Sequence, residues 1–125
     1  MDNAVNGAQD LAARYVALWN ETDAEARRAA IADLWRPDGM HFVKERIARG
    51  HAGLEQRVIG SYEKNVRDKG NRFRARGDAQ RLRDIVTFSW DMVPAGTDTV
   101  LAVGREFLVL DAEDRIISDY QFIIS

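Results

Sequence analysis

In the first half of the chain, hydrophobic residues recur at the three- and four-residue spacing typical of helices. The pattern predicts a first helix over about residues 4–19, with one buried face formed by Ala8, Leu11, Ala12, Tyr15 and Trp19. A second helix is expected to begin at Thr22, because Thr22 and Glu25 have the spacing of a capping box, and to run to Trp35. The segment RPDG, residues 36–39, predicts a turn after it.

The hydrophobic period changes from helical to strand-like near Asn71. Before it, residues 40–48 have the pattern of a strand with an irregular return, and Leu54, Val58, Tyr62 and Val66 repeat every fourth residue, which predicts a third helix that ends at Gly70. After it, alternation predicts four strands, at residues 72–76, 84–93, 99–111 and 115–124. The order α-α-β-α-β-β-β-β predicts an α+β fold with a mainly antiparallel sheet.

Length and composition limit the class of protein. With 125 residues, of which 46% are hydrophobic, we expect one domain over residues 1–125 with a core of its own. The net charge of -2 gives no electrostatic reason to expect nucleic acid or membrane as a partner. Cysteine is absent, which excludes disulfides and thiolate chemistry. The chain shows neither a signal peptide nor an apolar run of membrane-spanning length, so a cytoplasmic protein is expected.

One stretch, residues 67–84, is locally basic, with seven basic residues against three acidic ones, a net charge of +4. Arg72, Arg74 and Arg76 fall on one face of the predicted strand, and Phe73 is its only aromatic residue. Nucleic-acid surfaces usually add several aromatic side chains that stack on bases. We therefore interpret the stretch as the solvated outer face of an edge strand, where charge prevents aggregation.

Four motifs resemble a known superfamily: RYVALWNETD, LWRPDG, RGHAGLEQRV and DAEDRIISDYQF. Together they cover nearly the whole chain and are similar to the nuclear-transport-factor-2-like superfamily, more narrowly its SnoaL-like polyketide cyclase and ketosteroid isomerase branch. The resemblance implies a cone-shaped α+β barrel, in which three helices pack on a strongly curved sheet around an apolar cavity. It also implies a small apolar ligand, no cofactor and a homodimer that forms through the sheet.

The catalytic positions of the ketosteroid isomerases are only partly retained. Tyr15 matches the tyrosine that donates a hydrogen bond to the developing oxyanion, whereas Val43 occupies the place of the general-base aspartate. Arg105 corresponds to the second oxyanion donor, a buried protonated aspartic acid in those enzymes. Steroid isomerisation in that form is therefore not expected.

Strand alternation suggests which other side chains share the interior with Val43. His41 lies two residues earlier and points the same way; Phe88, Trp90 and Met92 form one face, and Val103 and Arg105 another. Both faces of the last strand are partly apolar, and the resemblance directs Asp119, Gln121 and Ile123 to the cavity. The candidate catalytic residues are His41, Tyr15, Asp119 and Arg105. The candidate ligand-binding residues are Trp19, Trp35, Val43, Phe88, Trp90, Met92, Val103 and Gln121.

Of these residues, His41 is the candidate general base, because its ordinary pKa of about 6.5 suits neutral pH. Tyr15 and Arg105 would stabilise negative charge on a carbonyl oxygen. Each also has a structural interpretation: Tyr15 and His41 as satisfied core residues, and Arg105 with Asp119 as an ion pair. His51 opens a helix and is expected to make a structural contact there.

Two histidines ten residues apart, without cysteine, match no usual metal-ligand spacing, so no metal is expected. The sequence thus favours a small-molecule-binding protein, with isomerase- or cyclase-type acid/base chemistry on an apolar carbonyl compound ahead of epoxide hydrolysis. The alternative is a noncatalytic ligand-binding or dimerising interaction domain.

Overall fold

A computed structural model describes residues 2–125 of the chain, with side chains from Gly7 onward. Three α-helices and a π-helical extension accompany seven strands. In chain order these are α1 (Asp2–Asn20), α2 (Ala24–Leu34), β1 (Trp35–Val43), β2 (Arg46–Arg49), α3 (Gly50–Ser61), η1 (Tyr62–Asp68), β3 (Asn71–Ala75), β4 (Gln80–Leu82), β5 (Ile85–Pro94), β6 (Ala102–Leu110) and β7 (Ile116–Ile123).

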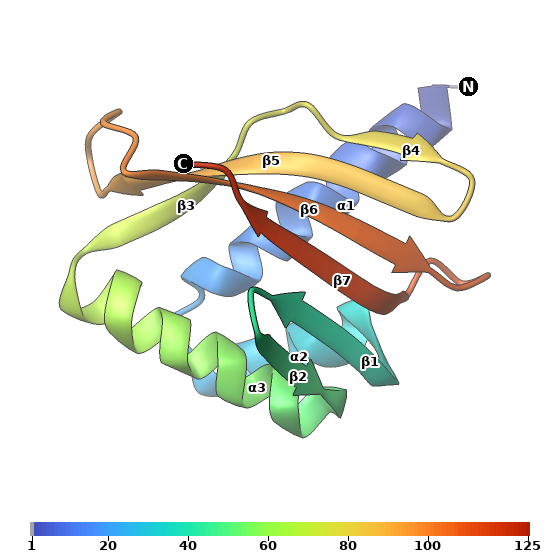
Figure 1. Ribbon diagram of the computed structural model, residues 1–125, viewed down its shortest axis with the longest axis horizontal. Coiled ribbons are helices and arrows are strands. Elements are labelled where there is room, and N and C mark those ends of the chain that lie inside the picture. Colours follow the sequence, from blue (N-terminus) through green and yellow to red (C-terminus); the bar gives the residue numbers. More distant parts are fainter. Residues whose placement is uncertain (1) are drawn as a thin grey trace.

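The strands form one sheet in the order β2-β1-β7-β6-β5-β3, with β4 paired to β5. Strand β1 runs parallel to β7, and every other pair is antiparallel. The sheet curves around α1, with α2 and α3 below it, and the helices cover one face (Figure 1). This arrangement confirms the predicted cone-shaped α+β barrel. The basic strand β3 lies at one edge of the sheet, as expected, and β2 lies at the other.

The N-cap of the second helix lies one residue later than predicted. Its N-cap is Asp23, whose carboxylate accepts a hydrogen bond from the backbone N–H of Ala26 at 2.8 Å, so the prediction of Thr22 as the cap is wrong. An aspartate side chain satisfies a free N–H at a helix start as well as a threonine does, and here it is the residue adjacent to the first turn. The helix ends at Leu34, which leaves Trp35 to begin β1.

The predicted turn at residues 36–39 is also wrong, because these residues belong to β1. The pairing of β1 with β7 shifts between Trp35 and Met40, so the segment forms an irregularity inside a strand. Gly39 permits it: a Cβ there would meet the Trp35 ring and lie 3.0 Å from the carbonyl oxygens of Arg36 and Ile116. A glycine is therefore required at position 39, because neighbouring backbone segments approach it closely, and a turn is not the reason.

The core lies between α1 and the concave face of the sheet. Tyr15 is at its centre, with ring centroids 5.7 Å from Trp35 and 5.4 Å from Phe88. On the convex face, Arg74 of β3 and Arg76, the residue after this strand, both pair with the buried carboxylate of Asp91, which supports the interpretation of the basic stretch as an outer surface. No described helix has the length and apolar character to cross a membrane.

Candidate functional site

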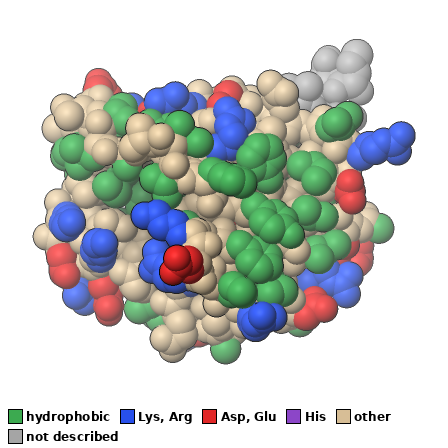
Figure 2. Space-filling view, in the orientation of Figure 1, with side chains coloured by type: hydrophobic (Ala, Val, Ile, Leu, Met, Phe, Trp, Pro, Cys, Tyr) green, Lys and Arg blue, Asp and Glu red, His purple; other side chains and the backbone are tan. Residues whose placement is uncertain are grey.

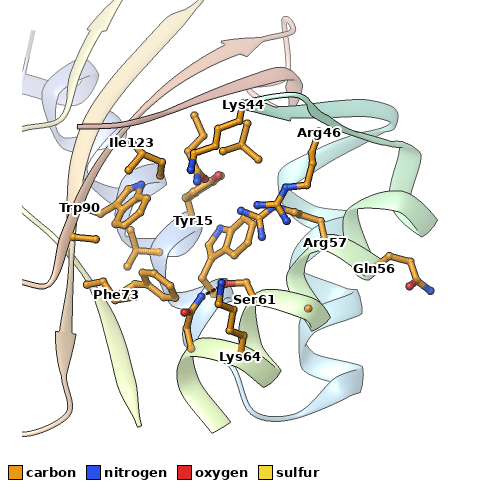
Figure 3. A pocket seen from close by; sticks show the side chains of 18 residues that line it. Tyr15, Lys44, Arg46, Gln56, Arg57, Ser61, Lys64, Phe73, Trp90 and Ile123 are labelled. Carbon is orange, nitrogen blue, oxygen red and sulfur yellow. Dashed lines mark hydrogen bonds between the residues drawn. The ribbon is translucent and has the colours of Figure 1, made fainter. Parts of the chain in front are cut away.

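The concave side of the sheet and the helices enclose an open cavity of about 420 Å³, within the usual range for small-molecule sites. Its apolar wall is formed by Val16, Trp19, Val43, Phe73, Trp90, Met92, Ala102 and Ile123. Tyr15 projects from α1 at the back, and side chains of α3, η1 and the β1–β2 turn form the other side (Figure 3). The cavity is thus mainly apolar at one side and polar at the other.

A buried cluster of hydrogen-bonding groups lies behind this wall. The hydroxyl oxygen of Tyr15 is 2.5 Å from Oδ2 of Asp119 and 3.0 Å from Oε1 of Glu106. The indole Nε1–H of Trp90 donates to the other oxygen of Glu106 at 2.7 Å. Both carboxyl groups are wholly buried. Tyr15 and Trp90, which line the cavity, therefore connect it to two acids that solvent does not reach.

The cluster needs more protons than one tyrosine supplies. Tyr15 carries a single hydroxyl proton, yet its oxygen lies within hydrogen-bond distance of two carboxyl groups. Burial, together with the charge of Glu106, raises the pKa of Asp119 well above its ordinary value. Burial raises the pKa of Glu106 as well, although the hydrogen bonds it accepts oppose that rise. The pKa of Asp119 is raised more strongly than that of Glu106, so of the two carboxyl groups Asp119 is the one that retains a proton to the higher pH.

His41 adjoins this cluster without sharing its proton. Its Nε2 lies 3.2 Å from Oε1 of Gln121 and 3.6 Å from Oδ2 of Asp119, and the residue is buried. Burial, with the nearby charge of Arg57, lowers the pKa of His41 from 6.5 to about 3. The imidazole is therefore neutral at physiological pH. The prediction that His41 keeps its ordinary pKa of about 6.5 is wrong.

No family model and no curated protein matches the chain, but solved structures do. A candidate isomerase of the SnoaL-like family from Agrobacterium tumefaciens superposes with a TM-score of 0.85 at 24% identity, covering 94% of this chain and 97% of that one. A nuclear-transport-factor-2-like protein of unknown function from Exiguobacterium gives 0.71 at 16% identity, with coverages of 92% and 98%. A candidate polyketide cyclase from Sinorhizobium meliloti gives 0.69 at 9% identity, with coverages of 90% and 94%.

The chain has the nuclear-transport-factor-2-like fold. The likeness covers nearly the full length of each chain, as the sequence motifs predicted. Within this fold the last strand, β7, turns Asp119, Gln121 and Ile123 inward: Asp119 is buried in the cluster, and the other two line the cavity. The predicted orientation of that strand is therefore confirmed.

The predicted orientation of β6 in this fold is wrong. Arg105 lies on the outer face, where it donates to Thr87 and pairs with Asp78 at 3.3 Å, and Val103 shares that face. Glu106 occupies the inner face instead. Gly104 could have indicated this orientation from the sequence. It pairs with Trp90, and a Cβ at position 104 would collide with the indole ring, so a glycine is required opposite this large side chain. That pairing fixes Glu106 as an inner residue.

The other predicted ligand-binding residues divide into two groups. Trp19, Val43, Trp90, Met92 and Gln121 line the cavity. Trp35 and Phe88 instead pack against the ring of Tyr15, and they belong to the core that holds it in place. His51 makes the structural contact expected of it, as its Nε2–H donates to the carbonyl of Trp35 at 3.0 Å.

The buried cluster also contains atoms with metal-ligand spacing, which the sequence did not reveal. Atoms of His41, Glu106 and Asp119 lie within 4.8 Å of one another. However, the hydroxyl of Tyr15 and the indole N–H of Trp90 already direct hydrogens at these carboxyl groups, and a cation would have to replace them. This donor set fits proton storage better than metal binding.

Proposed function

We propose that this protein binds a small, mainly apolar carbonyl compound and catalyses its isomerisation or cyclisation by proton transfer. Tyr15 would donate its proton to the carbonyl oxygen, and Asp119 would resupply Tyr15. Because Val43 occupies the place of the general-base aspartate, a water molecule would take the hydrogen from the carbon next to the carbonyl. The resulting enol would take a hydrogen from solvent at the original carbon or, for isomerisation, at a conjugated one, and its hydroxyl proton would return through Tyr15 to Asp119. Structural neighbours named as a candidate isomerase and a candidate polyketide cyclase support this reaction class.

The observation that supports this proposal best is the Tyr15–Glu106–Asp119 cluster. Burying two carboxyl groups costs free energy unless hydrogen bonds and a shared proton compensate for it, so such groups gather mainly where function requires them. A tyrosine backed by a protonated acid can stabilise a developing oxyanion. His41, neutral and hydrogen-bonded to Gln121, would hold the amide of Gln121 in position at the cavity wall.

The test is hydrogen–deuterium exchange into bound ketones. A panel of cyclic aryl ketones is incubated with the protein in D₂O, and loss of the NMR signals of hydrogens next to the carbonyl is followed. We expect the protein to accelerate this exchange for the ketones that bind. If ketones bind and none exchanges faster than in buffer, the protein is a noncatalytic binding protein, the alternative that Val43 favours.

A separate proposal concerns the partner of the sheet. We infer that a second copy of the chain covers the convex face of β1, β6 and β7, where Phe42 stacks on Tyr120 at 5.0 Å and Phe107 meets Phe122 at 5.7 Å. Phe122 is 55% exposed, more than half of a large apolar ring. Hydrophobic side chains gather over this part of the sheet in Figure 2. Apolar patches of this kind usually mark an interface.

Light scattering of the purified protein is expected to give the mass of a dimer. Phe122→Lys should shift the equilibrium to monomer, because it places a charge inside the interface. Leu82→Lys is the matched control: Leu82 is 77% exposed on β4, which pairs with β5 and not with β1, β6 or β7, and its replacement should leave the dimer intact. A monomer at all concentrations of the unmodified protein would rule the interface out.

A further inference from the structure

One side of the cavity carries four basic side chains and, among the described residues that line it, no acidic one. Arg57 projects from α3, Lys64 from η1, and Lys44 and Arg46 from the turn and strand after β1. Lys44, Arg46 and Lys64 are exposed at the opening, whereas Arg57 is half-buried. Figure 3 shows the guanidinium groups of Arg46 and Arg57 pointing toward each other on this side. Positive charge is thus concentrated where a ligand would enter.

These four cations lack the carboxylate partners that eight other basic residues of the protein have. Ion pairs within 4.0 Å hold the arginines at positions 14, 28, 36, 67, 74, 76, 81 and 105. Over residues 7–125, none of the four cavity cations forms such a pair. The Nε of Arg57 is buried and lacks a hydrogen-bond partner in the same part of the chain. A buried donor without a protein partner is available to hydrogen-bond a ligand that enters the cavity.

Arg57 is held in place at the cavity, because its guanidinium carbon lies 5.0 Å from the ring centroid of Trp19. Burial lowers its pKa, and the neighbouring charge of Arg46 lowers it further. Tyr15, Glu106 and Asp119 of the buried cluster oppose this lowering, yet the pKa of Arg57 stays below its ordinary value.

We propose that the ligand of this cavity carries an anionic group, in the simplest case a carboxylate, that Arg57 and Arg46 bind while its apolar body contacts Trp19 and Trp90. Guanidinium groups match the planar fork of a carboxylate and form strong paired hydrogen bonds with it. Lys44 and Lys64 at the opening would attract the anion and exclude cations. This inference rests on the proposed function for the existence of a small-molecule ligand and names its chemical class.

The test compares aryl acetates with their neutral amides by titration calorimetry. Phenylacetate, naphthylacetate and the corresponding acetamides share their apolar bodies and differ in charge. We expect the unmodified protein to bind at least one acid about tenfold or more tightly than its amide, the effect of one charged hydrogen-bonded contact. Arg57→Gln should remove that preference while changing the affinity for the amide by less than about twofold.

Two further variants keep the result interpretable. Arg46→Gln should reduce the preference for the acid in the same way. It replaces Arg57→Gln as the test variant if Arg57→Gln does not fold. Arg49→Gln is the matched control, because Arg49 is exposed on the same strand as Arg46 but points to the opposite face, and it should leave both affinities unchanged. Thermal melting confirms that each variant is folded.

The outcomes separate the two proposals. Equal binding of acids and amides overturns the anionic ligand and leaves an apolar ligand and the proton-transfer proposal in place. An acid preference that depends on Arg57, with no accelerated exchange into bound ketones, supports the anionic ligand and overturns the catalysis. No binding by any acid or amide overturns the anionic ligand, and the exchange measurement with ketones then decides the proton-transfer proposal alone.

Discussion

Tyr15→Phe is expected to slow deuterium exchange into bound ketones by about 100-fold or more, the usual contribution of a general acid. The phenyl ring retains the contacts with Trp35 and Phe88, so the shape of the cavity is preserved. What disappears is the hydroxyl group that joins the cavity to Glu106 and Asp119. Ketone affinity should change little, because the apolar wall is unaltered.

The control for this variant is Tyr62→Phe. Tyr62 lies in η1, where its ring contacts the guanidinium of Arg27 at 4.6 Å, outside the cavity. Removing that hydroxyl should leave both exchange and ketone affinity unchanged. Exchange by Tyr15→Phe at the rate of the unmodified protein would show that the cluster is structural and takes no part in catalysis.

Gly104→Ala is expected to lower the free energy of unfolding by about 3 kcal/mol or more. A Cβ at this position would overlap the indole ring of Trp90, which Phe73 contacts edge-on and which Glu106 holds by a hydrogen bond. The ring can move only by breaking that bond, so the cost combines overpacking with the loss of a buried charged hydrogen bond. Urea denaturation followed by circular dichroism measures the change.

Gly60→Ala is the comparison for this second variant. Gly60 lies inside α3, and no atom lies within 4 Å of the position its Cβ would take. Alanine should stabilise the helix by about 0.5–1 kcal/mol, since it restricts the unfolded chain. If both glycine variants have the same stability as the unmodified protein, the ring of Trp90 is not held in place by Phe73 and Glu106.

The sequence predicted most of the fold because its periods are unambiguous where one face is buried. The stripe that carries Tyr15 and Trp19 and the change of period at Asn71 determined the helix and strand regions. Strands β2 and β4 were missed, since four and three residues are too few for alternation to register. The turn predicted at Gly39 is absent for another reason. A glycine required by close contact with a neighbouring strand cannot be told from a turn glycine in the sequence.

The candidate site was predicted in part. Tyr15, Asp119 and Gln121 were placed correctly with the help of the resemblance, but β6 is apolar on both faces, so alternation could not separate Arg105 from Glu106. A shift of one residue exchanges the two faces of a strand. The prediction therefore placed Arg105 in the interior, where the structure has the buried acid Glu106. The low pKa of His41 was equally inaccessible, because it follows from burial and from Arg57, which α3 brings close from another part of the chain.

The central claim is that Asp119 holds a proton at neutral pH within the buried cluster. Carbon-13 NMR of the side-chain carboxyl carbons of labelled protein tests it most directly, with Asp119→Asn used to assign the resonance. We predict that the Asp119 carbon keeps the chemical shift of a protonated acid well above the ordinary pKa of aspartate, about 3.9. A resonance that titrates near that ordinary value, and is fully ionised at neutral pH, would contradict the account.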